Sequence, residues 1–322
     1  MYENQHGIYL SDLSGCSLTE AAEKLHLTQP ALSLAVRQEE KNIGSAIFDR
    51  SQRPWTLTMA GETYIRVAEQ IKWLESDLSR ELKELRDLNT GQIHIGGSHY
   101  INCFFLAEIL ADFTKKYPGI KLQISEDSSA RLSKRLERRE LDMTFSCAPE
   151  QINRFRHQPA FFDHILLAVP KQMALSRSIK ESAMSASDIQ QKRHLSTDCP
   201  RASLREFQEI EFILLQKGNN LHNRSLAMFE EAGFNPKVKM TLSQLVTAYR
   251  FAEQGLGATF ISDRIIFTAP SGELLYFSIA SQHANRLFYM LLSQRNYTAH
   301  SVNAFIKFMQ EWVLEKEGAH FP

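Results

Sequence analysis

The N-terminal fold is decided by residues 17–37, which read SLTEAAEKLHLTQPALSLAVR. A Ser or Thr precedes Ala21, Ala22 and Leu25, whose spacing predicts a short capped helix. Thr28 is a candidate cap for a second helix, and Pro30 lies in its first turn, where the missing N–H costs nothing. Two short helices joined by a tight link predict a helix-turn-helix, and the small alanines allow close approach.

The second helix carries polar side chains on one face. Gln29, Ser33 and Arg37 follow one another at spacings of four and therefore share a side. In a helix-turn-helix, this helix enters the major groove, where such side chains reach base edges or phosphates. We expect DNA contacts at Thr28, Gln29, Pro30, Ser33 and Arg37.

Residues 47–58, IFDRSQRPWTLT, predict two short strands around a basic turn. This pattern is typical of a wing, which can place Arg50 or Arg53 against the DNA backbone or in a minor groove. Charge alone argues against DNA, because residues 1–60 carry five Lys/Arg and seven Asp/Glu. The prediction of DNA binding therefore rests on the pattern of residues.

A long helix is predicted from Ala60 to Asn89, because Gly61 is followed by no Pro or Gly and apolar residues recur every three or four positions. The stripe consists of Ile65, Ala68, Ile71, Leu74, Leu78, Leu82 and Leu85. Such a stripe either packs on its own domain or pairs with a second helix. Its length and its charged opposite face favour dimerisation.

Composition places the chain among globular proteins with more than one domain. The 322 residues exceed one ordinary core, and 43% are hydrophobic and 23% charged. No apolar run is long enough to span a membrane, and residues 1–13 lack the features of a secretory signal. The four cysteines lack C-x-x-C spacing, so we expect reduced thiols and no metal or cofactor. We predict a cytoplasmic protein.

The chain resembles the LysR-type regulator family almost from end to end. The N-terminal signature of the family is matched in order and at unbroken spacing by residues 15–17, 21–22, 25, 29–33, 44, 47–48, 50, 57–58 and 60–61. Two features depart from it: Glu39 stands where the family usually has a buried Leu, and residues 7–13 hold few large apolar residues. The resemblance implies a winged helix-turn-helix regulator of transcription.

From residue 91 the periodicity indicates an α/β domain. An alternating strand at 92–97, a helix at about 103–117 and a second strand at 120–126 predict a parallel sheet. Residues 139–146, 212–215, 229–234 and 255–261 match the effector domain of the family. The resemblance implies two lobes of the type 2 periplasmic-binding-protein kind, connected by two crossover strands.

We predict three parts: a DNA-binding domain at 1–60, a dimerisation helix at 61–90 and an effector-binding domain at 91–322. The strand crossings are placed at 165–169 and 287–292. The first lobe then comprises 91–165 and 293–322, and the second comprises 166–292. Residues 170–205 are longer than in the family and predict a surface segment of the second lobe.

An effector is expected between the lobes, outside the carboxyl ends of the strands, where helix N-termini favour an anion. The candidate residues each follow a predicted strand. They are Ser98, His99, Tyr100, Ser128, Ser129, Ser146, Cys147, Asn219, Asn220 and Leu221. Each of them could instead be an ordinary cap or turn residue.

The sequence leaves three alternatives to a regulator. A cysteine near a histidine is a nucleophile candidate, and His99, Cys103 and Cys147 could approach one another, but such proximity arises easily by accident. A redox switch at Cys103, Cys147 or Cys199 is a second alternative. A stand-alone small-molecule-binding protein is the third, and the helix-turn-helix argues against it. We expect no enzymatic activity; the expected partners are promoter DNA, a small-molecule effector, further copies of the chain and RNA polymerase, with no membrane.

Overall fold

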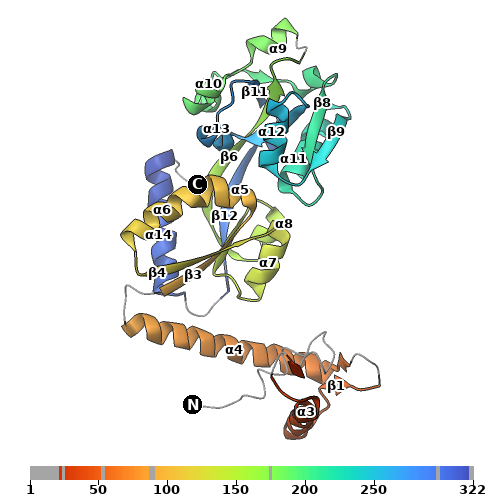
Figure 1. The fold of residues 1–322 in the computed structure, drawn as a ribbon, viewed down its shortest axis with the longest axis vertical. Helices are drawn as coiled ribbons and strands as arrows, with labels where there is room; N and C mark the ends of the chain where they lie inside the picture. The colour runs from red at the N-terminus through yellow and green to blue at the C-terminus, as the bar shows by residue number, and fades with distance from the viewer. Residues whose placement is uncertain are drawn as a thin grey trace. The chain divides into compact units, whose positions relative to one another are not determined.

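The computed structural model describes residues 22–23, 26–51, 55–86, 91–173, 176–294 and 298–318. It divides the chain into two units, Met1–Arg86 and Asp87–Pro322 (Figure 1). Most of the predicted helix at 17–25 lies outside the described residues, as do residues 7–13 and Arg53. No helix within the described ranges is long and apolar enough to cross a membrane.

The first unit is built around α3 (Gln29–Ile43). The Thr28 side chain accepts a hydrogen bond from the Ala31 N–H and caps the helix, which ends at Gly44 with a left-handed φ of 73°. Leu32 and Val36 are buried in a small apolar core. The predicted cap and second helix are thus present.

The predicted wing and long helix follow. Strands β1 (Phe48–Asp49) and β2 (Thr56–Leu57) pair antiparallel, and α4 (Met59–Arg86) extends for 28 residues. Gly61 lets α4 approach the wing closely, because a Cβ there would lie 2.0 Å from the Ile47 carbonyl oxygen. The N-terminal end of α4 is therefore fixed against the wing.

The first lobe of the second unit has a sheet in the order β4-β3-β5-β12-β6. Strands β3 and β4 pair in parallel, as predicted for the βαβ start, whereas β12 is antiparallel to both β5 and β6. A π-helical turn at Asn102–Leu106 interrupts the first helix. The strands are β3 (Gly91–Gly97), β4 (Ile120–Glu126), β5 (Met143–Ser146), β6 (Arg156–Pro170) and β12 (Asn285–Leu292), and the helices are α5 (His99–Ile101), α6 (Ala107–Lys116), α7 (Ser129–Glu137), α8 (Pro149–Ile152) and α14 (His300–Glu317).

The second lobe continues the sheet from β6 in the order β6-β10-β8-β9, and β11 pairs with β6 and β7. Its large apolar core is separate from that of the first lobe. The strands are β7 (Arg201–Ala202), β8 (Glu211–Leu215), β9 (Lys237–Leu242), β10 (Ala258–Ser262) and β11 (Leu274–Ile279), and the helices are α9 (Arg177–Glu181), α10 (Ala186–Gln190), α11 (Asn220–Ala232), α12 (Leu245–Glu253) and α13 (Asp263–Thr268).

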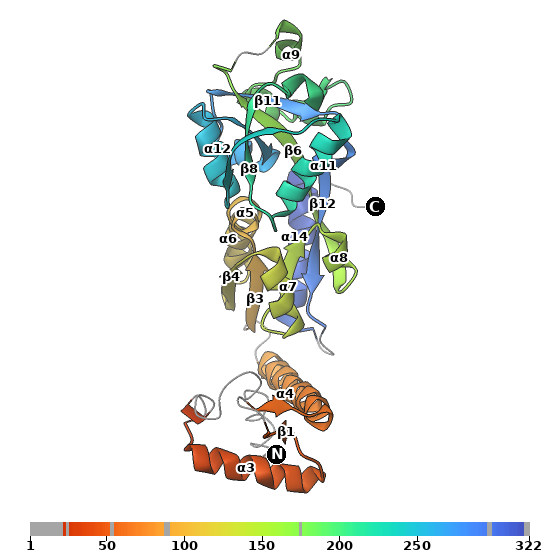
Figure 2. The same ribbon diagram turned by 90° about the vertical axis from the view of Figure 1, so that its right-hand side faces the viewer.

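Strand β6 belongs to both lobes (Figure 2). Residues 156–164 pair with β12, and residues 165–168 pair with β10, so the strand crosses at His164/Ile165. The return crossing comes before Asn285, because all of β12 pairs within the first-lobe sheet. Residues 285–292 therefore belong to the first lobe, and the expectation that 287–292 form the crossing and end the second lobe is corrected.

Residues 170–205, predicted to form a surface segment, also contribute side chains to the core of the second lobe. Ile179, Met184, Ile189 and Cys199 are buried in the second-lobe core. The 3₁₀ turn Arg193–Leu195 carries His194, whose side chain is also buried. This segment therefore helps to build the second lobe.

Candidate functional site

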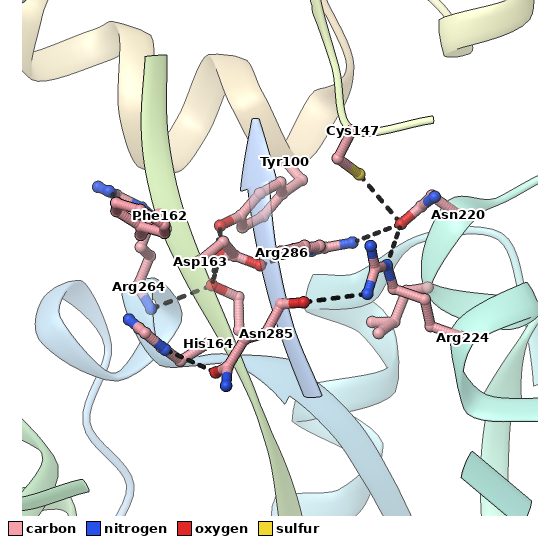
Figure 3. A network of polar contacts seen from close by, with 12 residues as sticks. Tyr100, Cys147, Phe162, Asp163, His164, Asn220, Arg224, Arg264, Asn285 and Arg286 are labelled. Atoms are coloured by element: carbon pink, nitrogen blue, oxygen red, sulfur yellow. Dashed lines mark hydrogen bonds and ion pairs between the residues drawn. The ribbon is translucent and has the colours of Figure 1, made fainter. Parts of the chain in front are cut away.

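A buried polar seam lies where β6 passes between the lobes (Figure 3). Asp163 of β6 is fully buried, and its Oδ2 accepts a hydrogen bond of 2.5 Å from Arg286 Nε on β12. Its Oδ1 accepts from the hydroxyls of Tyr100 and Ser262. Because Tyr100 belongs to the first lobe and Ser262 to the second, this one carboxylate ties the two lobes together.

The Asn220 side chain extends the seam at the start of α11. Its Oδ1 accepts from Arg286 Nη1 at 3.2 Å, Arg224 Nε at 3.1 Å and Cys147 Sγ at 3.1 Å. Arg224 also donates to the carbonyl oxygens of His283 and Asn285. Two guanidinium groups thus converge on one amide oxygen, as Figure 3 shows.

The partners of Asp163 hold its negative charge against the effect of burial. Burial acts to raise the pKa of the Asp163 carboxyl, but the Arg286 guanidinium and the Ser262 and Tyr100 hydroxyls hold that pKa below its ordinary value. Burial and the neighbouring carboxylate raise the pKa of Tyr100 well above its usual range. Asp163 is therefore ionised and Tyr100 neutral at physiological pH.

The ten predicted effector residues divide into two groups. Tyr100, Cys147 and Asn220 meet in the seam. Ser98, Ser128 and Asn219 cap α5, α7 and α11, Ser129 is the first residue of α7, and Leu221 is buried in the second-lobe core. Ser146 accepts from the Ala148 N–H, and His99 Nδ1 lies 3.3 Å from Glu126 Oε1. An effector role for any of the ten stays a prediction.

The predicted DNA-contacting face of α3 is largely exposed. Gln29 and Arg37 are exposed, and Ser33 is half-buried between them. Arg50 is held by an ion pair with Glu40 Oε2 at 2.5 Å and lies 5.0 Å from the centre of the Trp55 ring. Because part of its charge is already neutralised, Arg50 is less available to phosphate than Arg37.

Glu39, which departs from the family signature, has a partner in this chain. Its Oε1 accepts a hydrogen bond of 2.7 Å from the Tyr64 hydroxyl on α4, and its Oε2 accepts from Asn42 Nδ2. Burial, together with the hydrogen bond and charge of Glu39, raises the pKa of Tyr64. Glu39 therefore links α3 to α4, and both of its carboxylate oxygens have hydrogen-bond partners.

The exposed face of α4 carries four residues of the predicted stripe. Ile65 is buried in the core of the first unit, but Ile71, Leu74, Leu78 and Leu82 are each 43–56% exposed. Exposed apolar residues at steps of three and four form a stripe that a partner helix could cover.

Two family models match the chain. One, described as the LysR substrate binding domain, matches residues 86–314, and the other, the bacterial regulatory helix-turn-helix protein of the lysR family, matches residues 14–62. The chain belongs to the LysR family. It is therefore a DNA-binding transcriptional regulator with an effector-binding domain.

Relatives and solved structures agree with this family. The uncharacterized HTH-type transcriptional regulator YcgK of Bacillus subtilis is 28% identical over 92% of this chain and 90% of its own length. The HTH-type transcriptional regulator CfxR of Cupriavidus necator is 26% identical over 88% of this chain and 83% of its own length. Full-length BenM (TM-score 0.57, 17% identity, 100% and 99% covered) and full-length CbnR complexed with its target DNA (TM-score 0.59, 13% identity, 97% and 99% covered) share the fold.

The thiols of this LysR-family chain give little support to a redox or nucleophilic role. Cys103 Sγ lies 3.7 Å from His99 Nε2, but burial and the Glu126 carboxylate raise the pKa of Cys103. Burial likewise raises the pKa of Cys147, which donates to Asn220 and does not join the other two. Raised pKa values disfavour the thiolate that both chemistries require. Cys199 is a buried free thiol against Met184.

Four residues of the seam were not predicted from the sequence: Asp163, Arg224, Ser262 and Arg286. Asp163 and Arg286 each adjoin an apolar strand, and a charge in such a run must be buried with a partner. That signal was present in the sequence. Ser262 and Arg224 left no comparable signal, because their roles depend on contacts between segments far apart in the chain.

Proposed function

We propose that this LysR-family regulator acts as a cytoplasmic homodimer or tetramer, which reads promoter half-sites through α3 and responds to a small organic anion at the seam. The exposed stripe on α4 supports dimerisation. On the DNA side, the supporting observation is the shared polar face of Gln29, Ser33 and Arg37. Contact with RNA polymerase is part of the same proposal.

The anionic effector follows from the charges around Asn220. Arg224 and Arg286 converge on its side chain, whereas Asp163 is the carboxylate that balances Arg286. Arg224 is half-buried, and its described partners are carbonyl and amide oxygens, with no carboxylate among them. A carboxylate or phosphate on a ligand would give this guanidinium a charged partner. This excess positive charge carries the effector proposal.

DNA binding is tested by fluorescence anisotropy with DNA from upstream of the chain's own gene. Arg37→Ala should weaken binding about tenfold or more, because a base contact by arginine contributes roughly 1–3 kcal/mol. Arg50→Ala should have the smaller effect, and Lys180→Ala on α9 is the control for a lost surface charge. Undiminished binding in both Arg37→Ala and Arg53→Ala would contradict the assignment.

Dimerisation and effector binding need separate tests. Leu74→Lys with Leu78→Lys should shift sedimentation of the full chain toward the monomer. A thermal-shift screen of small carboxylates and phosphates, each with a neutral amide or alcohol counterpart, should give hits among the anions. Arg224→Gln should remove the hits that bind at the seam. Survival of every hit in this variant would place the effector elsewhere, and turnover of any hit would indicate an enzyme.

A further inference from the structure

A cavity of about 700 Å³ lies between the lobes, and none of the seam residues is among those that line it. Its first-lobe wall comes from the π-helical turn, β6 and the C-terminal part of α14, and its second-lobe wall comes from residues 192–201 and α13. We call this cavity the rear groove. None of the ten predicted effector residues is among the described residues that line it.

Neighbouring residues divide between the seam and the rear groove. Asp163, Ser262 and Arg286 belong to the seam, and the adjoining His164, Asp263 and Asn285 line the rear groove. Successive side chains of a strand point to opposite faces, so the two sites lie back to back across the crossing strands. Figure 3 shows Arg264 and His164 on one side of β6 and Asn220 and Arg224 on the other.

The walls of the rear groove gather apolar side chains that remain partly open to solvent. Phe162, Leu195 and Phe267 are 36%, 46% and 39% exposed. They come from three separate segments of the two lobes. Clustered, exposed aromatic and aliphatic groups in a concave site indicate a ligand with an apolar body.

Positive charge dominates the polar lining. Four cations, Lys192, Arg201, Arg264 and Lys316, stand against the carboxylates of Glu108 and Asp263. The Arg264 guanidinium lies 4.4 Å from the centre of the Phe161 ring and donates to the Phe162 carbonyl oxygen, which fixes its position. This balance favours an anionic group on the ligand.

His194 adds a buried polar atom to the lining of the rear groove. Its side chain is 1% exposed, and its Nε2 lies 3.0 Å from Asp263 Oδ2. Its Nδ1 is buried and finds no hydrogen-bond partner among the described residues. A ligand in the groove would supply the hydrogen-bond partner that Nδ1 lacks among the described residues, which would satisfy both ring nitrogens.

We propose that the rear groove is a second ligand site, which takes an organic anion with an aromatic body. A ligand there contacts both lobes and holds them in one arrangement. Because three pairs of neighbouring residues join the groove to the seam, occupancy of one site alters affinity at the other. This coupling rests on the proposed function of the seam, whereas binding in the groove does not.

The test is calorimetric titration of the full chain with 2-naphthoate and with neutral 2-naphthamide. Naphthoate should bind saturably, and the amide should bind about tenfold more weakly. Leu195→Glu and Lys192→Glu should each weaken naphthoate binding about tenfold or more, because they add negative charge to the groove wall. Leu314→Glu on α14 and Lys180→Glu on α9 are matched exposed controls that line no part of the groove, and both should bind as the parent does.

His194→Gln examines the buried nitrogen. The glutamine Nε2 can keep the contact with Asp263 but offers nothing at the position of Nδ1, so naphthoate affinity should fall while the fold, followed by circular dichroism, is retained. Absence of naphthoate binding, or binding unchanged in Leu195→Glu and Lys192→Glu, overturns the proposal. Binding removed only by Arg224→Gln also overturns it, while that result supports the effector role of the seam.

Discussion

The seam and the rear groove use adjoining residues of the same strands for opposite purposes. In the seam, Asp163 and Arg286 are almost fully buried and neutralise each other. In the rear groove, aromatic and cationic side chains remain partly exposed, and positive charge is in excess. A strand shared by two lobes can therefore carry a buried ion pair on one face and partly exposed aromatic and cationic side chains on the other.

The largest effect is expected from Asp163→Asn. It leaves the buried Arg286 without its counter-charge, and breaking a buried ion pair in this way costs about 3–5 kcal/mol of the free energy of unfolding. Urea denaturation followed by circular dichroism measures this loss. His164→Ala, at the next residue, is the matched control and should cost far less. Equal losses in the two variants would remove the distinction between seam and groove.

The same contact can be replaced instead of broken. Asp163→Leu combined with Arg286→Met removes both charges, so most of the stability lost in Asp163→Asn should return. A double variant as unstable as the single one would show that packing at these positions, and not the unpaired charge, sets the cost.

Acid should weaken the seam selectively. The folded pKa of Asp163 is lowered, so its contribution to stability is complete above the unfolded value of about 3.9 and is lost as pH falls below it. The difference in unfolding free energy between the parent and Asp163→Asn should therefore be constant from about pH 7 to 5 and shrink below about pH 4. A difference that stays constant to lower pH would contradict the ionised assignment.

Ser262→Ala should have an intermediate effect. It removes a donor to Asp163 and the side-chain cap of the Arg264 N–H, at a cost of about 1–3 kcal/mol. Thermal and urea denaturation both measure it. A cost as large as that of Asp163→Asn would mean that the hydroxyl, more than Arg286, holds the carboxylate.

The smallest effect is expected from Leu195→Ala in the rear groove. The side chain is exposed, so stability should change by no more than about 0.5 kcal/mol, although naphthoate binding should weaken. A large loss of stability would mean that Leu195 belongs to the packed core and not to a binding surface.

Much of the fold could be predicted from the sequence. Strand periodicity placed β3 and β4 almost to the residue, and capping patterns gave the start of α3. The second crossing between the lobes was harder to place from the sequence, because β12 would be apolar in either lobe. Its pairing with β6 determines that it belongs to the first lobe. Local pattern identifies a strand but not its neighbour in a sheet.

The candidate site was predicted only in part. Residues after the strands of the first lobe led to Tyr100 and Cys147, whereas Arg224 lies a full turn inside α11 and reaches Asn220 only because helical spacing brings them together. The rear groove left no signal in advance, since His194, Arg264 and Trp312 converge from segments far apart in the sequence.

The hydrogen bond between Glu39 and Tyr64 has a mechanical consequence. It joins the helix expected to read DNA to α4, which at 28 residues is about 42 Å long. Because this hydrogen bond restrains the angle between the two helices, a rotation of α4 about its axis also rotates α3. Tyr64→Phe would make the angle between α3 and α4 more flexible. The regulator would then discriminate less strongly between DNA sites with different half-site spacings.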